Sequence, residues 1–214
     1  MVKDAIRSAN IATTVTLCLA LASWPLIGPA EAEISPSTVQ GATPSGVYQV
    51  DANHRYLTFS YDHLGYSHPI LRFDDFTASL TLDAVRPENS RVDATIQTAS
   101  LRSGVVAFDG HLASARFFDA AQFPTITFRS TKVTPTSPEG ATVVGDLTIK
   151  GVTHPATLNV TLNRAGSHPM SGRPTVGFTA TGKITRSQWG LGAMSPAVGD
   201  QIDIHIEAEF SLAP

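Results

Sequence analysis

The sequence predicts an all-β protein in which about eight antiparallel strands form a barrel, accompanied by one short helix. About eight runs alternate apolar and polar residues with a period of two, so each predicted strand has one apolar face and one solvent-facing side. Glycine, proline, asparagine and aspartate separate these runs, as turns between strands require. Eight strands suffice to close a barrel around an interior that holds one small ligand.

The N-terminus has the pattern of a cleaved signal peptide, which we expect to span residues 1–32. Lys3 and Arg7 precede an uncharged apolar stretch over 11–28, and Ala30-Glu31-Ala32 provides the small residues of a cleavage site. An uncleaved membrane anchor is the alternative. The cleavage site directly after the apolar stretch favours export with removal of the segment.

Composition limits the classes of function that remain. The single cysteine, Cys18, lies inside the predicted signal peptide, so the mature chain is expected to have no disulfide, thiolate nucleophile or cysteine-ligated metal. The net charge is −3, which argues against nucleic acid as a partner. The remaining length suits one domain, predicted over 47–214, and the Ser-, Pro- and Gly-rich segment 33–46 is predicted to be a flexible leader.

The first strands follow Tyr48. Alternation is clear over 57–62 and again over 91–97. In the long run 71–83 between them, the apolar residues move from odd-numbered positions up to Phe73 to even-numbered positions from Phe76. This shift predicts a β-bulge that redirects one continuous strand.

A short helix is predicted near 110–118, because Asp109 and Gly110 provide an N-cap and three apolar residues then share one side: Leu112, Ala115 and Phe118. Pro124 forces an extended conformation on the preceding residue, and the alternation of a strand begins at Thr125. The aromatic side chains of this segment predict a plug over an apolar interior.

Four further alternating runs complete the barrel, at 143–150, 157–163, 176–184 and 201–212. The length of the runs 71–83 and 174–186 favours curved barrel strands over an eight-stranded sandwich with a filled core. In a closed barrel the first and last strands pair and leave no free edge.

An outer-membrane barrel is a further alternative, because it also has alternating strands with an apolar outer face. That architecture needs aromatic girdles at both membrane interfaces, whereas the aromatic residues here lie within strands or in the plug. The sequence therefore favours the version whose apolar side chains point inward.

Sequence signatures of catalysis are missing. The chain has no G-x-S-x-G or H-E-x-x-H motif, no glycine-rich phosphate loop and no calcium loop, which leaves only a dispersed Ser-His-Asp triad as a catalytic alternative. Imidazoles at one barrel end could bind a metal, but the candidates lack ligand spacing: His54, His63, His68, His111 and His154. We therefore predict no catalytic residue, no metal site and no enzyme activity.

Short motifs over 46–212, taken together and in order, resemble the YceI-like family of bacterial periplasmic proteins. Two positions depart from the family pattern, since Arg55 replaces a usual serine and His68-Pro69 replaces a more glycine-rich turn. The motifs are Tyr48-x-x-Asp51-x-x-His54, His63-Leu64-Gly65, His111-Leu112, Phe117-Phe118-Asp119, Phe123 to Phe128, Gly145 to Thr153, Pro155, Arg186-Ser187-x-x-Gly190 and Gly199-Asp200.

The resemblance implies a lipocalin-like barrel that encloses a long polyisoprenoid chain, such as a quinone or a prenyl (pyro)phosphate carries. The expected function is therefore that of a periplasmic binding or carrier protein, with no cofactor other than the bound lipid. The resemblance also allows other long-chain amphiphiles such as fatty amides, transient contact with the inner membrane or a membrane cytochrome, and a homodimer.

The apolar residues of the alternating runs share one face of each predicted strand, and we predict that they line the lipid site: Phe59, Phe73, Phe76, Ile126, Phe128, Leu147, Leu158, Val160, Phe178, Ile202 and Ile204. We predict that His111, Arg186 or Trp189 contacts the lipid head group. Two alternative functions remain open at this point. One is an enzyme that acts on a lipid or quinone with a histidine as general base, and the other is a redox or stress partner protein of a membrane cytochrome whose barrel is simply its core.

Overall fold

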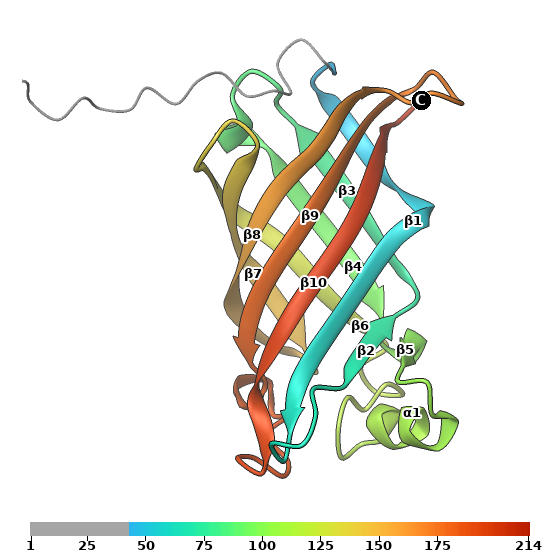
Figure 1. Ribbon diagram of the computed structural model, residues 1–214, viewed down its shortest axis with the longest axis vertical. Coiled ribbons are helices and arrows are strands. Elements are labelled where there is room, and N and C mark those ends of the chain that lie inside the picture. Colours follow the sequence, from blue (N-terminus) through green and yellow to red (C-terminus); the bar gives the residue numbers. More distant parts are fainter. Residues whose placement is uncertain (1–42) are drawn as a thin grey trace, which may run out of the picture. The chain divides into compact units, whose positions relative to one another are not determined.

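Eight strands of the computed structural model close into an antiparallel barrel (Figure 1). The structure describes residues 43–214, so the predicted signal peptide and most of the predicted leader lie outside the described residues. The barrel strands are β1 Gly46–His63, β3 Phe76–Leu82, β4 Arg91–Gln97, β6 Thr125–Pro135, β7 Gly140–Ile149, β8 Val152–Ser167, β9 Pro174–Thr185 and β10 Val198–Leu212. Two short strands and one α-helix accompany them, together with the 3₁₀ turns Pro87–Asn89, Thr98–Ser100 and Arg186–Trp189.

Closure comes from the pairing of β1 with β10, which extends from Tyr48 opposite Leu212 to His63 opposite Val198. The other barrel strands pair in the order β10-β9-β8-β7-β6-β4-β3-β1. A ring of eight strands in which each strand has two partners leaves no free edge, so the predicted barrel is confirmed and the sandwich is not.

The run 71–83 is two strands, and the prediction of one bulged strand was wrong. β2, Ile70–Phe73, pairs with the second half of β1, whereas β3 pairs with the first half. Between them, the backbone N–H groups of Asp74 and Asp75 donate to the carbonyl oxygen and Oγ of Ser100, at 3.1 and 3.0 Å. These bonds take both residues out of the barrel ladder. Outside the barrel, β5, Leu101–Arg102, extends the sheet beyond β2.

The helix, α1, spans Val106–Ala113 and therefore lies earlier than the predicted 110–118. Asp109 is not its N-cap. The Asp109 carboxylate lies inside the helix and accepts hydrogen bonds from the backbone N–H and Oγ of Ser103, each at 2.6 Å. Ser114 ends the helix because its N–H and Oγ both donate to the carbonyl of His111.

The two faces of each strand differ in polarity as the alternation predicted. On β10, Ile202 and Phe210 are buried inside the barrel, whereas Asp203 on the outside pairs with Lys183 of β9 at 2.5 Å. The outer-membrane alternative required the opposite arrangement. Among residues 43–214, no helix is long and apolar enough to cross a membrane.

Replacing Gly145 with alanine is expected to destabilise the barrel by about 2–3 kcal/mol, because overpacking a strand contact forces backbone shifts. A Cβ on Gly145 of β7 would lie 2.4 Å from Cζ of Phe128 and 2.6 Å from the carbonyl oxygen of Arg129. Gly177→Ala is the matched control, because there the nearest atom, Cγ of Glu209, lies 4.0 Å away. Urea unfolding of both variants measures the difference, and equal stabilities would contradict this packing.

Candidate ligand-binding site

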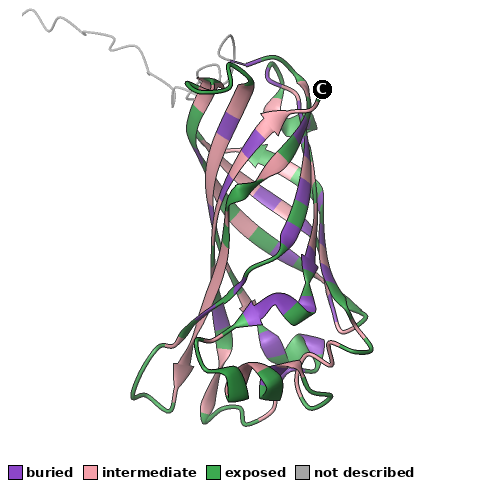
Figure 2. Cartoon of the chain, turned by 90° about the vertical axis from the view of Figure 1, so that its right-hand side faces the viewer, coloured by how far each residue is buried: buried purple, intermediate pink, exposed green. Residues whose placement is uncertain are grey.

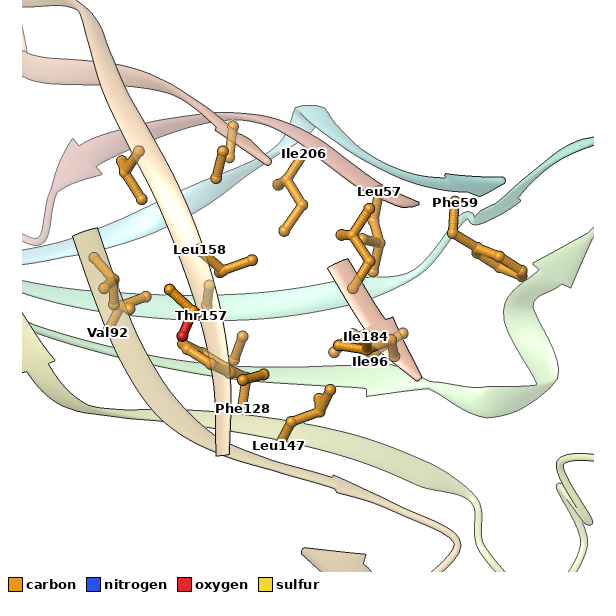
Figure 3. Close-up of a pocket in the computed structure, with 18 of the residues that line it drawn as sticks. Leu57, Phe59, Val92, Ile96, Phe128, Leu147, Thr157, Leu158, Ile184 and Ile206 are labelled. Atoms are coloured by element: carbon orange, nitrogen blue, oxygen red, sulfur yellow. The ribbon is translucent and has the colours of Figure 1, made fainter. Parts of the chain in front are cut away.

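A cavity of about 860 Å³ runs inside the barrel (Figure 3). All eight barrel strands contribute side chains to its wall, and α1 with the segment after it contributes at one end. Ligand pockets in proteins usually measure roughly 300–1,000 Å³, so this volume suits a large ligand. The sequence could not show that such a cavity exists.

All eleven residues that the apolar alternation predicted as lining residues do line this cavity. Their common position follows from the strand period of two, which places every second side chain on the inner face. That these side chains contact a lipid stays a prediction.

Several apolar side chains inside the barrel are only half-buried. Leu57, Phe59, Leu158, Ile184 and Ile206 point toward the same space (Figure 3) and retain exposure to it. In a filled core these side chains would be covered by their neighbours. A site lined in this way offers few hydrogen bonds to water, so covering it with an apolar ligand is favourable.

The helix end of the cavity is lined by an aromatic cluster, as the predicted plug required. Phe118 packs edge-on against Phe73 of β2 with ring centroids 5.8 Å apart. His111 of α1 lies between Phe108 and Phe117, at centroid distances of 6.3 and 4.8 Å. His111 therefore lines the cavity and also reaches solvent.

Arg186 places a buried positive charge at the same end of the cavity. Its guanidinium donates hydrogen bonds only to backbone carbonyls, and it forms no ion pair within residues 43–214. The acceptors are the carbonyls of Leu191, Ala193 at 3.0 Å, Val198 at 2.7 Å and Gly199 at 2.8 Å. Arg186 thus braces the β9–β10 loop and brings one positive charge to this end of the cavity.

Tyr61 and His63 also line the helix end, although neither was among the predicted lining or head-group residues. Both lie on the same face of β1 as Phe59, two and four residues further along, so the alternation of the strand could have identified them. Burial raises the pKa of the Tyr61 phenol, and the charge of Arg186 opposes that rise. The polar groups at this end are therefore Tyr61, His63, His111 and Arg186.

Trp189 does not line the cavity. Its indole is buried, and Nε1 donates to the carbonyl of Leu147 on β7 at 3.0 Å. The ring packs edge-on against His154 at 5.3 Å. Of the three predicted head-group residues, the structure therefore brings His111 and Arg186 to the cavity, whereas Trp189 supports the wall from behind.

The opposite end of the cavity is lined by residues of the β3–β4 and β6–β7 connections, including Glu88, Ser137 and Glu139, and by Arg91 at the start of β4. Sequence reasoning missed this end completely. Alternation identifies the faces of strands, but connections have no such period, so no local signal marked these side chains.

The histidines with carboxylate partners lie away from the cavity. His54 is 3.0 Å from Asp51 and His205 is 2.9 Å from Glu207, both on the exposed outer wall, and the exposed His68 is 3.6 Å from Asp62 at the helix end but does not line the cavity. Within residues 43–214, no group of three or more histidine, cysteine, aspartate or glutamate side chains is placed to hold a metal ion. Of the histidines that line the cavity, His63 and His111, neither forms an ion pair with a carboxylate within residues 43–214.

Tyr61 is expected to ionise above pH 10.0, the ordinary pKa of tyrosine, because burial penalises the phenolate. Its folded pKa is raised, so the stability that it contributes is present below pH 10.0 and is lost as the pH rises through the folded value. Ultraviolet difference titration of the protein and of Tyr61→Phe measures this. The variant should lose one late-titrating phenol, and an unchanged late fraction would contradict the placement of Tyr61.

Comparisons with known proteins give one consistent result. The model of the YceI-like domain matches residues 48–210. A UPF0312 protein of Pseudomonas putida is 35% identical over 171 residues, which cover 79% of this chain and 88% of the relative. The structure of a YceI protein of Campylobacter jejuni superposes with a TM-score of 0.64 at 27% identity, over 72% of this chain and 90% of that one.

A more distant structure has the same fold. It is a domain from Saccharophagus degradans that is described as polyisoprenoid-binding, and it superposes with a TM-score of 0.60 at 13% identity. The match covers 78% of this chain and 98% of that domain.

Proposed function

This chain belongs to the YceI-like family, and we propose that it is a periplasmic protein that binds and carries a long-chain isoprenoid lipid inside its barrel. One observation carries the proposal, namely a cavity of about 860 Å³ whose lining is almost entirely apolar and includes half-buried side chains such as Leu57, Phe59 and Leu158. The name of the Saccharophagus degradans domain, which has the same fold, supports the same class of ligand. The signal-like N-terminus supports export.

Burial of the tail supplies the affinity. Each buried CH₂ contributes about 0.8 kcal/mol, so a tail of a few dozen carbons would nominally exceed the roughly −18 to −21 kcal/mol at which non-covalent affinities saturate. Ordering the flexible chain offsets much of this gain. Binding should therefore be tight and tolerant of tail chemistry, and the head group supplies the selectivity.

The head group is placed at the helix end in this proposal. The buried charge of Arg186, the phenol of Tyr61 and the imidazoles of His63 and His111 are the polar groups there. Hydrogen bonds that involve a charged donor are the stronger ones, so this end favours a head rich in acceptor oxygens. A quinone and a prenyl phosphate both meet that description.

Native mass spectrometry of the protein purified from an exporting host tests the proposal, followed by organic extraction and identification of what is released. The expected result is one long-chain isoprenoid per protein. As a control, protein stripped by unfolding and refolding should regain that mass when a prenyl lipid is added. A mass without lipid that also refuses prenyl lipids would contradict the proposal, and the enzyme and partner-protein hypotheses would replace it.

A further inference from the structure

Exposed apolar side chains gather at the helix end of the barrel. The opposite end and the outer wall have fewer, namely Val47, Val85, Met170 and Tyr56. Tyr66 and Val106 are 89% and 87% exposed, so they are almost entirely outside the fold. The full set at the helix end is Leu64, Tyr66, Ile70, Val105, Val106, Val152 and Met194.

Three separate segments bring these side chains to one end. The β1–β2 loop carries Leu64 and Tyr66, the β9–β10 loop carries Met194, and Val106 begins α1. The two loops are joined, since the N–H of Leu64 donates to the carbonyl of Ala197 at 3.2 Å. Both loops and α1 lie at the lower end of the barrel in Figure 1, and much of that end is exposed in Figure 2.

This apolar rim, defined as Leu64, Tyr66, Val105, Val106 and Met194, is continuous with the cavity. Met194 is exposed and also lines the cavity wall. Met194 therefore connects the rim with the cavity, whereas the other four rim residues do not line it. The opposite end lacks a comparable group of apolar tips.

Charges of both signs lie around the rim, and two of the cations are available to lipid phosphates. The charge of Asp74 is offset by its ion pair with Arg72, whereas Asp62 and Asp109 accept hydrogen bonds from the neutral donors of Gly65 and Ser103 and keep their negative charge. By contrast, Arg116 and Lys150 form no ion pair within residues 43–214. The two cations are neighbours, because Nζ of Lys150 lies 3.5 Å from the carbonyl of Ala115.

We propose that the apolar rim docks onto the surface of a lipid bilayer, with Tyr66 and Val106 inserted among the head groups. A protein partner of ordinary affinity needs a continuous surface of about 800 Å² per side, whereas these tips stand on separate loops with polar residues between them. A bilayer interface accepts single apolar and aromatic side chains at a depth of about 5–10 Å. That docking serves ligand exchange rests on the proposed function. The position of the exposed apolar side chains at the helix end does not depend on it.

Vesicle flotation tests this surface, with vesicles of phosphatidylethanolamine and phosphatidylglycerol as the probe. The double variant Tyr66→Ser and Val106→Ser is expected to partition at least tenfold less than the unmodified protein, because it loses two inserted apolar groups. The control is Met170→Ser, whose side chain is 92% exposed at the opposite end of the barrel and should leave partitioning unchanged. Equal loss in the control, or no loss in the double variant, would overturn the proposal.

A polarity-sensitive dye gives a second measurement. The single cysteine, Cys18, lies in the predicted signal peptide, so the exported protein can be labelled specifically at Tyr66→Cys or at Met170→Cys. Vesicles should shift the emission to the blue at position 66 only. A rim that instead binds a second copy would show dimers in sedimentation without vesicle binding, and this outcome overturns the proposal.

Lipid loading is measured separately by native mass spectrometry. Loading without vesicle binding therefore refutes docking alone, and vesicle binding without loading refutes the proposed function alone.

Discussion

Replacing Ala180 with phenylalanine is expected to weaken lipid binding by about a hundredfold, or about 2.8 kcal/mol. Ala180 of β9 is buried, lines the cavity and lies between Val160 and Ile206 in the sheet. A ring at this position would enter the space that the tail needs. Titration with a fluorescent prenyl analogue measures the affinity of the variant and of the unmodified protein.

Thr181→Phe is the matched control for that experiment. Thr181 is the next residue on the same strand and is exposed on the outer wall, opposite Asn159 and His205. The same ring placed there should leave lipid affinity unchanged. Because the cavity has room for a ring, Ala180→Phe should also keep its stability within about 1.5 kcal/mol, whereas overpacking a filled core typically costs more. Lipid binding unaffected by Ala180→Phe would contradict the assigned lining.

Arg186→Ala is expected to destabilise the protein by about 3 kcal/mol, because each buried acceptor left without a donor costs roughly 1–3 kcal/mol and the loop can relax to recover part of this. The guanidinium donates to carbonyls of Leu191, Ala193, Val198 and Gly199, which hold the β9–β10 loop against the barrel. Urea unfolding followed by the fluorescence of Trp189, which is buried nearby in the same turn, measures the loss.

Two further variants isolate the cause. Arg102 donates to the carbonyls of Ala99 and Leu101, but its side chain is 46% exposed, so Arg102→Ala should cost less than about 1 kcal/mol. Arg186→Lys keeps the charge and loses the planar fork, so it should recover only part of the stability. Full recovery by lysine would show that the charge, and not the array of carbonyl bonds, stabilises the loop.

Much of the barrel was predictable because the direction of each side chain in a strand depends only on its position along that strand. A period of two fixes which face of each strand is apolar, and the eleven residues that were predicted from it all line the cavity. The pairing of β1 with β10 followed from the need to leave no edge unpaired.

The errors have a common physical cause, namely hydrogen bonds to residues that local patterns do not include. The strand over 71–83 breaks because Ser100 binds the backbone at Asp74 and Asp75. The helix begins early, and Asp109 binds Ser103 instead of capping it. Likewise, alternation shows that Leu158 points inward but not whether another side chain fills the space in front of it.

The measurement that tests the central claim most directly is a crystal structure of the protein with the lipid that it retains from the exporting host. The expected result is continuous electron density for one tail inside the barrel, in contact with Leu147, Leu158 and Ile204, with its head toward Arg186. A lipid bound on the outer wall, or a barrel whose side chains close the space of about 860 Å³, would contradict the account.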